Sequence, residues 1–134
     1  MKNKIIIGLI LSILVACSKK DDFNSEYERL EGYWLLTEIT GGIAGTGYEA
    51  NFDHLQVNDG QRYSLMIQDA VLQEGTYKLS EEGDQLIIHF SSANSDEITF
   101  DNELKTVVFS DEDRKLTLAD PCCDLYTYSF IREE

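Results

Sequence analysis

The sequence has little of several residue types on which catalytic, metal-binding and nucleic-acid-binding sites depend. Its 134 residues include 2 histidines, 3 cysteines and 1 proline, and 11 Lys and Arg residues stand against 25 Asp and Glu residues, for a formal net charge of −14. A phosphate backbone repels a chain this acidic, so we expect no nucleic-acid partner. His54 and His89 are far apart in sequence, without a Cys or a second His at ligand spacing, which predicts no metal site.

Motifs for enzymatic chemistry are also missing from the sequence. No Gly-x-Ser-x-Gly, phosphate-binding loop or nucleotide fingerprint occurs. The acidic groups near Asp96, Asp101 and Asp111 do not match a calcium-binding loop and are interpreted as solvated turns. We therefore expect neither an enzyme nor a cofactor. A catalytic alternative would need polar groups that converge inside the fold, and Glu38 with Tyr128 is the only pair that qualifies.

Two of the cysteines, Cys122 and Cys123, are adjacent. Neighbouring Cα atoms lie about 3.8 Å apart, which is below the usual disulfide range. A strained vicinal disulfide, a bridge to another chain and two buried thiols all remain open. We expect a structural rather than a redox role for this pair.

An apolar run near the start of the chain indicates export. Residues 5–15 form an apolar run, interrupted only by Ser12, that follows Lys2 and Lys4. The run is too short for a membrane-spanning helix but suits a signal peptide. Ala16 then precedes Cys17. This arrangement resembles the lipobox of bacterial lipoproteins, in which the cysteine is acylated and the signal is removed before it. The resemblance implies a signal peptide over residues 1–16, lipidation of Cys17, and a membrane anchor in the outer membrane of a Gram-negative bacterium.

Residues 17–25 carry two open interpretations. The run Ser18-Lys19-Lys20-Asp21-Asp22 is either a solvated, charged tether or, because it ends in paired acids next to the cysteine, resembles the surface-export signal of some Gram-negative lipoproteins. The protein would accordingly face the periplasm or the cell surface. Since one acyl chain anchors only weakly and an acidic chain has no electrostatic attraction to anionic lipid, the anchor needs more than one chain on Cys17.

Residues 26–134 have the pattern of a single all-β domain. Ser25 and Glu28 match a capping box and predict a short helix that ends before Gly32. Short apolar and β-branched runs separated by polar turns follow at 32–40, 55–57, 63–67, 71–79, 85–90, 98–100, 104–109, 114–118 and 125–131. Antiparallel pairing of the first and last strands requires an even number, so the weak run 98–100 is expected to be irregular. The sequence predicts an antiparallel up-and-down β-barrel of about eight strands with a short N-terminal helix.

Three segments then resemble the lipocalin-like domains of bacterial lipoproteins, over roughly residues 30–132. They are Gly32-x-Trp34, the run Gly75-Thr76-Tyr77-Lys78-Leu79, and the run Tyr128-Ser129-Phe130-Ile131-Arg132. The resemblance implies a barrel that Trp34 closes at one end, with Arg132 over its ring, and that holds a small apolar ligand at the other. Period-2 alternation independently puts Trp34 and Arg132 on the required faces of their strands.

Eight strands would place four loops at the open mouth, at residues 41–51, 69–70, 92–103 and 120–123. The first is glycine-rich, and its only large apolar residues, Ile43 and Tyr48, are candidates to fold over a ligand. The other candidate ligand-facing residues are Tyr63, Tyr77, Phe90, Tyr126 and Tyr128. We expect a lipid-anchored protein of the cell envelope that binds a small hydrophobic ligand. Because the interior candidates are large, a filled barrel that acts as a protein- or glycan-interaction or structural module is the alternative.

Overall fold

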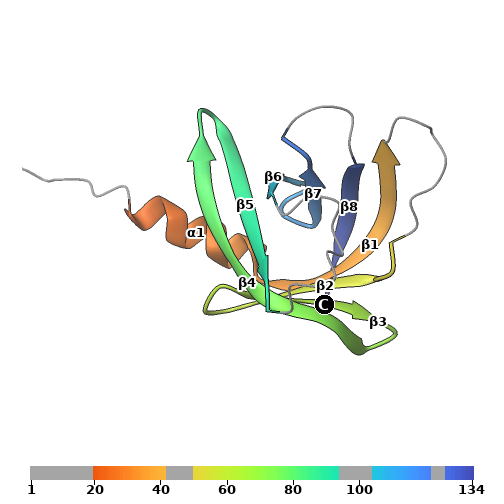
Figure 1. Ribbon diagram of the computed structural model, residues 1–134. Helices are drawn as coiled ribbons and strands as arrows, with labels where there is room; N and C mark the ends of the chain where they lie inside the picture. The colour runs from red at the N-terminus through yellow and green to blue at the C-terminus, as the bar shows by residue number, and fades with distance from the viewer. Residues whose placement is uncertain (1–19, 42–49, 94–103, 122–125) are drawn as a thin grey trace, which may run out of the picture.

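In the described part of the chain, the computed structural model is a closed barrel of eight antiparallel strands with one helix at its N-terminal side (Figure 1). The structure describes residues 20–41, 50–93, 104–121 and 126–134, and the side chains from residue 24 onward. The elements are α1 (Lys20–Leu30), β1 (Gly32–Gly41), β2 (His54–Asn58), β3 (Arg62–Ile67), β4 (Ala70–Glu82), β5 (Gln85–Ser92), β6 (Leu104–Ser110), β7 (Lys115–Ala119) and β8 (Tyr126–Glu133). Each strand pairs with the next, and β1 pairs with β8. The predicted up-and-down barrel with a short helix is confirmed; the run 98–100 lies outside the described residues.

Because the strands run alternately up and down, successive connections lie at opposite ends of the barrel. The tight turns after β2, β4 and β6 lie at the end next to α1, and β1, β3, β5 and β7 finish at the opposite end (Figure 1). Gly60 and Gly83, in the first two of these turns, have positive φ angles of 71° and 62°, a conformation that glycine adopts without strain. The ends that the sequence assigned to the closed base and the open mouth are therefore distinct.

The helix is longer than the sequence predicted. It begins at Lys20, so Ser25 lies inside it rather than at its cap, and residues 20–25 of the predicted tether are helical. The segment before Ser25 contains no Gly or Pro, and Asp21 and Asp22 fall in the first turn, where negative charge favours the helix dipole. No helix in the described ranges is long and apolar enough to cross a bilayer.

An irregularity in β1 corrects one prediction. The register with β8 shifts between Leu36, which opposes Phe130, and Glu38, which opposes Ser129. The extra residue, Thr37, reverses the alternation of side chains along the rest of the strand. Glu38 is consequently exposed. The predicted pairing of Glu38 with Tyr128 inside the barrel is therefore wrong.

The long strand β4 turns a corner that lets the barrel close. It pairs with β3 along its first half and with β5 along its second, and Figure 1 shows it curving from one set of strands to the other. Gly75 lies at the bend. A Cβ atom there would collide with the backbone carbonyl of Ser91 and would lie 2.8 Å from the Tyr63 ring. Glycine at this position therefore permits the close approach of β4 and β5.

Candidate functional site

The closed end of the barrel is built around Trp34, which is completely buried. Its indole Nε1 donates a hydrogen bond to the Leu30 carbonyl at 2.9 Å, and the guanidinium carbon of Arg132 lies 4.2 Å from its ring centroid. Arg132 also donates to the carbonyls of Arg29 and Glu31, at 2.6 Å each. The last carbonyls of a helix have no intrahelical partner. Here barrel side chains donate to those of Arg29 and Leu30 and to that of Glu31, which directly follows α1. The positive guanidinium also complements the negative end of the helix dipole.

The glycine two residues before the tryptophan has a physical reason in this arrangement. Gly32 has a φ angle of 142°, and a Cβ atom on it would lie 2.6 Å from Nη1 of Arg132. Any other residue would be strained there and would displace the guanidinium from the Trp34 ring. The Gly-x-Trp pattern and the final arginine are thus parts of one contact.

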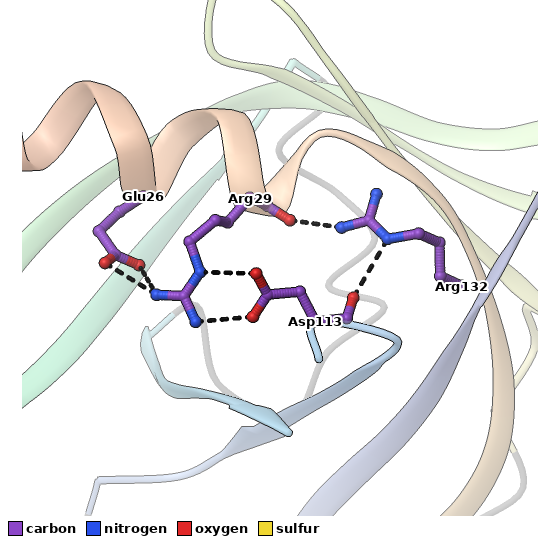
Figure 2. A network of polar contacts seen from close by, with 4 residues as sticks. All are labelled: Glu26, Arg29, Asp113 and Arg132. Carbon is purple, nitrogen blue, oxygen red and sulfur yellow. Dashed lines mark hydrogen bonds and ion pairs between the residues drawn. The ribbon is translucent and has the colours of Figure 1, made fainter. Parts of the chain in front are cut away.

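A second arginine joins the helix to the turn between β6 and β7 (Figure 2). Arg29 donates two hydrogen bonds to the Asp113 carboxylate, at 3.1 and 2.7 Å, and also pairs with Glu26. Its guanidinium carbon lies 4.4 Å from the centroid of the Phe109 ring. Arg132 Nε donates to the Asp113 carbonyl at 3.2 Å. The hydrogen bonds from Arg29 lower the pKa of Asp113 below its ordinary value, so this carboxylate is charged near neutral pH. The ion pair of Arg29 and Asp113 therefore connects α1 to the turn between β6 and β7.

The predicted ligand-facing aromatics do lie on the inner side of the barrel wherever the structure describes them. Tyr63, Tyr77, Phe90 and Tyr128 are buried, and Tyr126 is partly buried against the core. Tyr63 and Phe90 meet edge to face at 4.8 Å between ring centroids. Burial also raises the pKa of Tyr77, which keeps its hydroxyl neutral. Ile43, Tyr48, Cys17, Cys122 and Cys123 lie outside the described residues.

One interior aromatic was missed at the sequence level. Phe52, just before β2, is 3 % exposed and lies in stacked orientations near Tyr128 and Phe130, with ring centroids 6.3 and 6.5 Å apart. It belongs to no strand, so strand periodicity could not reveal it. A single large apolar residue at the end of a glycine-rich loop was the only available signal.

A buried ion pair inside the barrel was not predicted from the sequence. Lys105 Nζ lies 2.5 Å from Asp120 Oδ1, with the two side chains 0 % and 3 % exposed. Nζ is also 5.5 Å from the centroid of the Tyr128 ring. Period-2 alternation could have found the lysine, because it lies two residues before Val107 and four before Phe109, which face the core.

The position of this pair distinguishes it from the closed end. Lys105 lies near the start of β6 and Asp120 directly follows β7, so both are toward the end of the barrel opposite α1. The desolvation cost of a buried ion pair can exceed the Coulombic gain, so apolar residues at these positions would serve stability as well or better. The pair places an ammonium group, a carboxylate and a tyrosine ring together in an interior that is otherwise mostly apolar. Such a combination can bind the polar end of a small molecule.

The two histidines are used in hydrogen bonds on the outer surface. His54 lies between two carboxylates, with Nδ1 2.8 Å from Asp53 and Nε2 3.1 Å from Glu133, and its ring stacks on Tyr33. His89 Nε2 lies 3.1 Å from the Ser80 hydroxyl. Among the described residues, no group of three or more His, Cys, Asp and Glu side chains could hold a metal ion.

The chain matches no protein-family profile, no curated protein and no solved structure at a significant level. The geometry of its own residues is therefore the basis on which a function can be inferred.

Proposed function

We propose that the protein is a lipid-anchored, lipocalin-like barrel of the cell envelope that binds a small apolar ligand in its interior, toward the open end. The observation that carries this proposal is the buried pair of Lys105 and Asp120 beside Tyr128. Small-molecule sites are typically concave and apolar with a few fixed polar groups that orient the ligand. The ligand class that fits is a mainly apolar molecule with one polar group.

The closed end supports entry from one side only. Trp34, Arg132 and the end of α1 fill the base of the barrel with a continuous set of contacts. A ligand would therefore enter where β1, β3, β5 and β7 finish. In this proposal Ile43 and Tyr48 of the loop 41–51 contact the ligand from the mouth.

The proposed anchor is consistent with the placement of the helix. Cys17, the proposed lipidation site after the signal peptide 1–16, lies three residues before the start of α1. Tyr27 and Leu30 of α1 pack against the core, and the Tyr27 hydroxyl accepts a hydrogen bond from the Leu79 amide at 3.0 Å. The C-terminal end of α1 thus adjoins the closed end, and the proposed anchor precedes the other end of this helix in the sequence. We propose the outer membrane of a Gram-negative bacterium as the location, with the barrel facing the periplasm or the cell surface.

A filled barrel that acts as a protein- or glycan-interaction or structural module is the second candidate. The observation that favours it is the close packing of interior rings. Phe52 stacks near Tyr128 and Phe130, and Tyr63 contacts Phe90. In this alternative the ion pair of Lys105 and Asp120 would only set the conformation of the chain after β7.

Native mass spectrometry of the full chain, purified in detergent from its own host, separates the two candidates. Ligand binding predicts an extra noncovalent mass that disappears after extraction with organic solvent. The paired substitution Lys105→Met with Asp120→Asn, which removes both charges, should lower the bound fraction. Lys78→Met, on the exposed outer face of β4 opposite His89, is the matched control and should not.

Hydrogen exchange supplies the second measurement. Adding lipid extract from the host to stripped protein should slow exchange in the loop 41–51. If no mass is bound and exchange is unchanged, the interaction module is favoured. Protection confined to the turns near Gly83 and Asp111 would contradict the proposed entrance, because these turns lie at the end of the barrel next to α1.

A further inference from the structure

A hollow of about 360 Å³ lies on strands β2, β3 and β4, apart from the barrel interior. Its volume is at the lower end of the range of small-molecule sites, about 300 to 1,000 Å³. The polar and apolar side chains that matter for its chemistry are Gln56, Asn58, Arg62, Ser64, Val71 and Glu74. Figure 1 shows β2, β3 and the first part of β4 side by side in the lower part of the view.

The strand register places the polar side chains in rows across the three strands. Gln56 opposes Ser64, and Ser64 opposes Glu74, while Asn58 opposes Arg62 in the next row. Residues that alternate with them along β3, such as Tyr63 and Leu65, are buried in the core. The rows therefore belong to the outer face of the barrel.

The fold leaves the hydrogen-bonding capacity of these side chains unused. Within the described ranges, Gln56, Asn58, Arg62, Ser64 and Glu74 make no side-chain hydrogen bond or ion pair, in contrast to the closed end. Ser64 is 7 % exposed and lines the hollow together with the amide side chains of Gln56 and Asn58. A ligand in the hollow could therefore form hydrogen bonds with these groups without breaking any that the fold uses.

The chemistry of the hollow favours a neutral ligand rich in hydroxyl groups. The positive charge of Arg62 and the negative charge of Glu74 cancel, so neither an anion nor a cation is selected. Amide, carboxylate and guanidinium groups each offer two hydrogen-bonding atoms in a plane, and a sugar hydroxyl can both donate and accept. Val71, which is 52 % exposed, offers an apolar contact for the C–H face of a sugar ring.

We propose that this hollow binds a neutral saccharide, either as a free sugar or as the end of a glycan. An anionic sugar would meet Glu74 and a chain with a net charge of −14, which would oppose it. The site lies outside the barrel, so it does not depend on a ligand in the interior. It would give the protein a second binding surface.

The test is a titration of the full chain in detergent with glucose, galactose, mannose, N-acetylglucosamine and their disaccharides, followed by calorimetry and saturation-transfer NMR. At least one neutral sugar should bind at millimolar concentration, and glucuronate and sugar phosphates should bind at least tenfold more weakly. Gln56→Ala and Glu74→Ala should each weaken binding about tenfold, equivalent to about 1.4 kcal/mol. Lys78→Ala, elsewhere on the outer face of β4, should bind as wild type.

Polysaccharide pull-down separates the two sources of the saccharide. Binding of a monosaccharide indicates a free sugar, and binding only to a polymer indicates a glycan end; both support the proposal. The proposal is wrong if neither binds, if anionic sugars bind equally well, or if Gln56→Ala and Glu74→Ala bind as wild type. If Glu74→Ala does not fold, Gln56→Ala alone decides.

Discussion

The guanidinium carbon of Arg132 lies 4.2 Å from the centroid of the Trp34 ring, and the same group donates hydrogen bonds to two carbonyls at the end of α1. A cation over a buried indole stabilises by about 2 kcal/mol when it is desolvated. Here the cation also connects residues that are far apart in the chain. The contact therefore joins the helix, the first strand and the last strand.

Arg132→Lys should destabilise the fold although the charge is kept. Lysine carries a single ammonium group and cannot reach the Arg29, Glu31 and Asp113 carbonyls together. Hydrogen bonds to charged groups contribute about 1.5 to 3 kcal/mol each, so we expect a loss of about 2 to 3 kcal/mol in the free energy of unfolding. Urea unfolding measures it. Arg114→Lys, at an exposed turn position, is the control; equal midpoints for the two variants would contradict the assignment.

Lys105→Met should cost about 3 to 5 kcal/mol, because it leaves the buried Asp120 carboxylate without its charged partner. Adding Asp120→Asn removes that uncompensated charge and should restore part of the stability. Chemical unfolding of the two single variants and the double variant gives the coupling free energy. Strictly additive effects would show that the two groups do not interact in solution.

Acid sensitivity should depend on Asp113. Hydrogen bonds from Arg29 lower its pKa in the folded state, so its stabilising effect is complete above the ordinary Asp pKa of about 3.9 and is lost as the pH falls through the folded-state pKa. Asp113→Asn should therefore be less stable than wild type near neutral pH, and the difference should vanish below that window. Asparagine tolerates the φ angle of 63° at this position. Parallel thermal melts from pH 7 to pH 2 measure the gap, and a constant gap would contradict the prediction.

Cys17→Ser should abolish lipidation and either release the protein from membranes or block removal of the signal peptide. Wild-type protein should incorporate labelled palmitate, and the variant should not. Cys122→Ser is the matched control and should be labelled like wild type. A mature N-terminus upstream of Cys17, or an intact mass without acyl chains, would exclude the proposed anchor.

Local patterns in the sequence were sufficient for the strands and turns of this protein. Side chains alternate every two residues along a strand, and Gly and Asp mark tight turns, so the eight strands and the inward-facing Trp34, Tyr63 and Tyr77 could be predicted. Both signals depend only on residues that are close in sequence, so they predict strands and turns before the three-dimensional structure is known.

The tertiary structure decided what depends on pairing between strands. The extra residue at Thr37 moved Glu38 to the surface, because a bulge is specified by its partner strand rather than by its own sequence. Asp120 lies beside Lys105 only because β7 returns along β6. Gln56, Ser64 and Glu74 form one row only because three strands share a register. Contacts of this kind arise from barrel closure, which no single segment of the chain encodes.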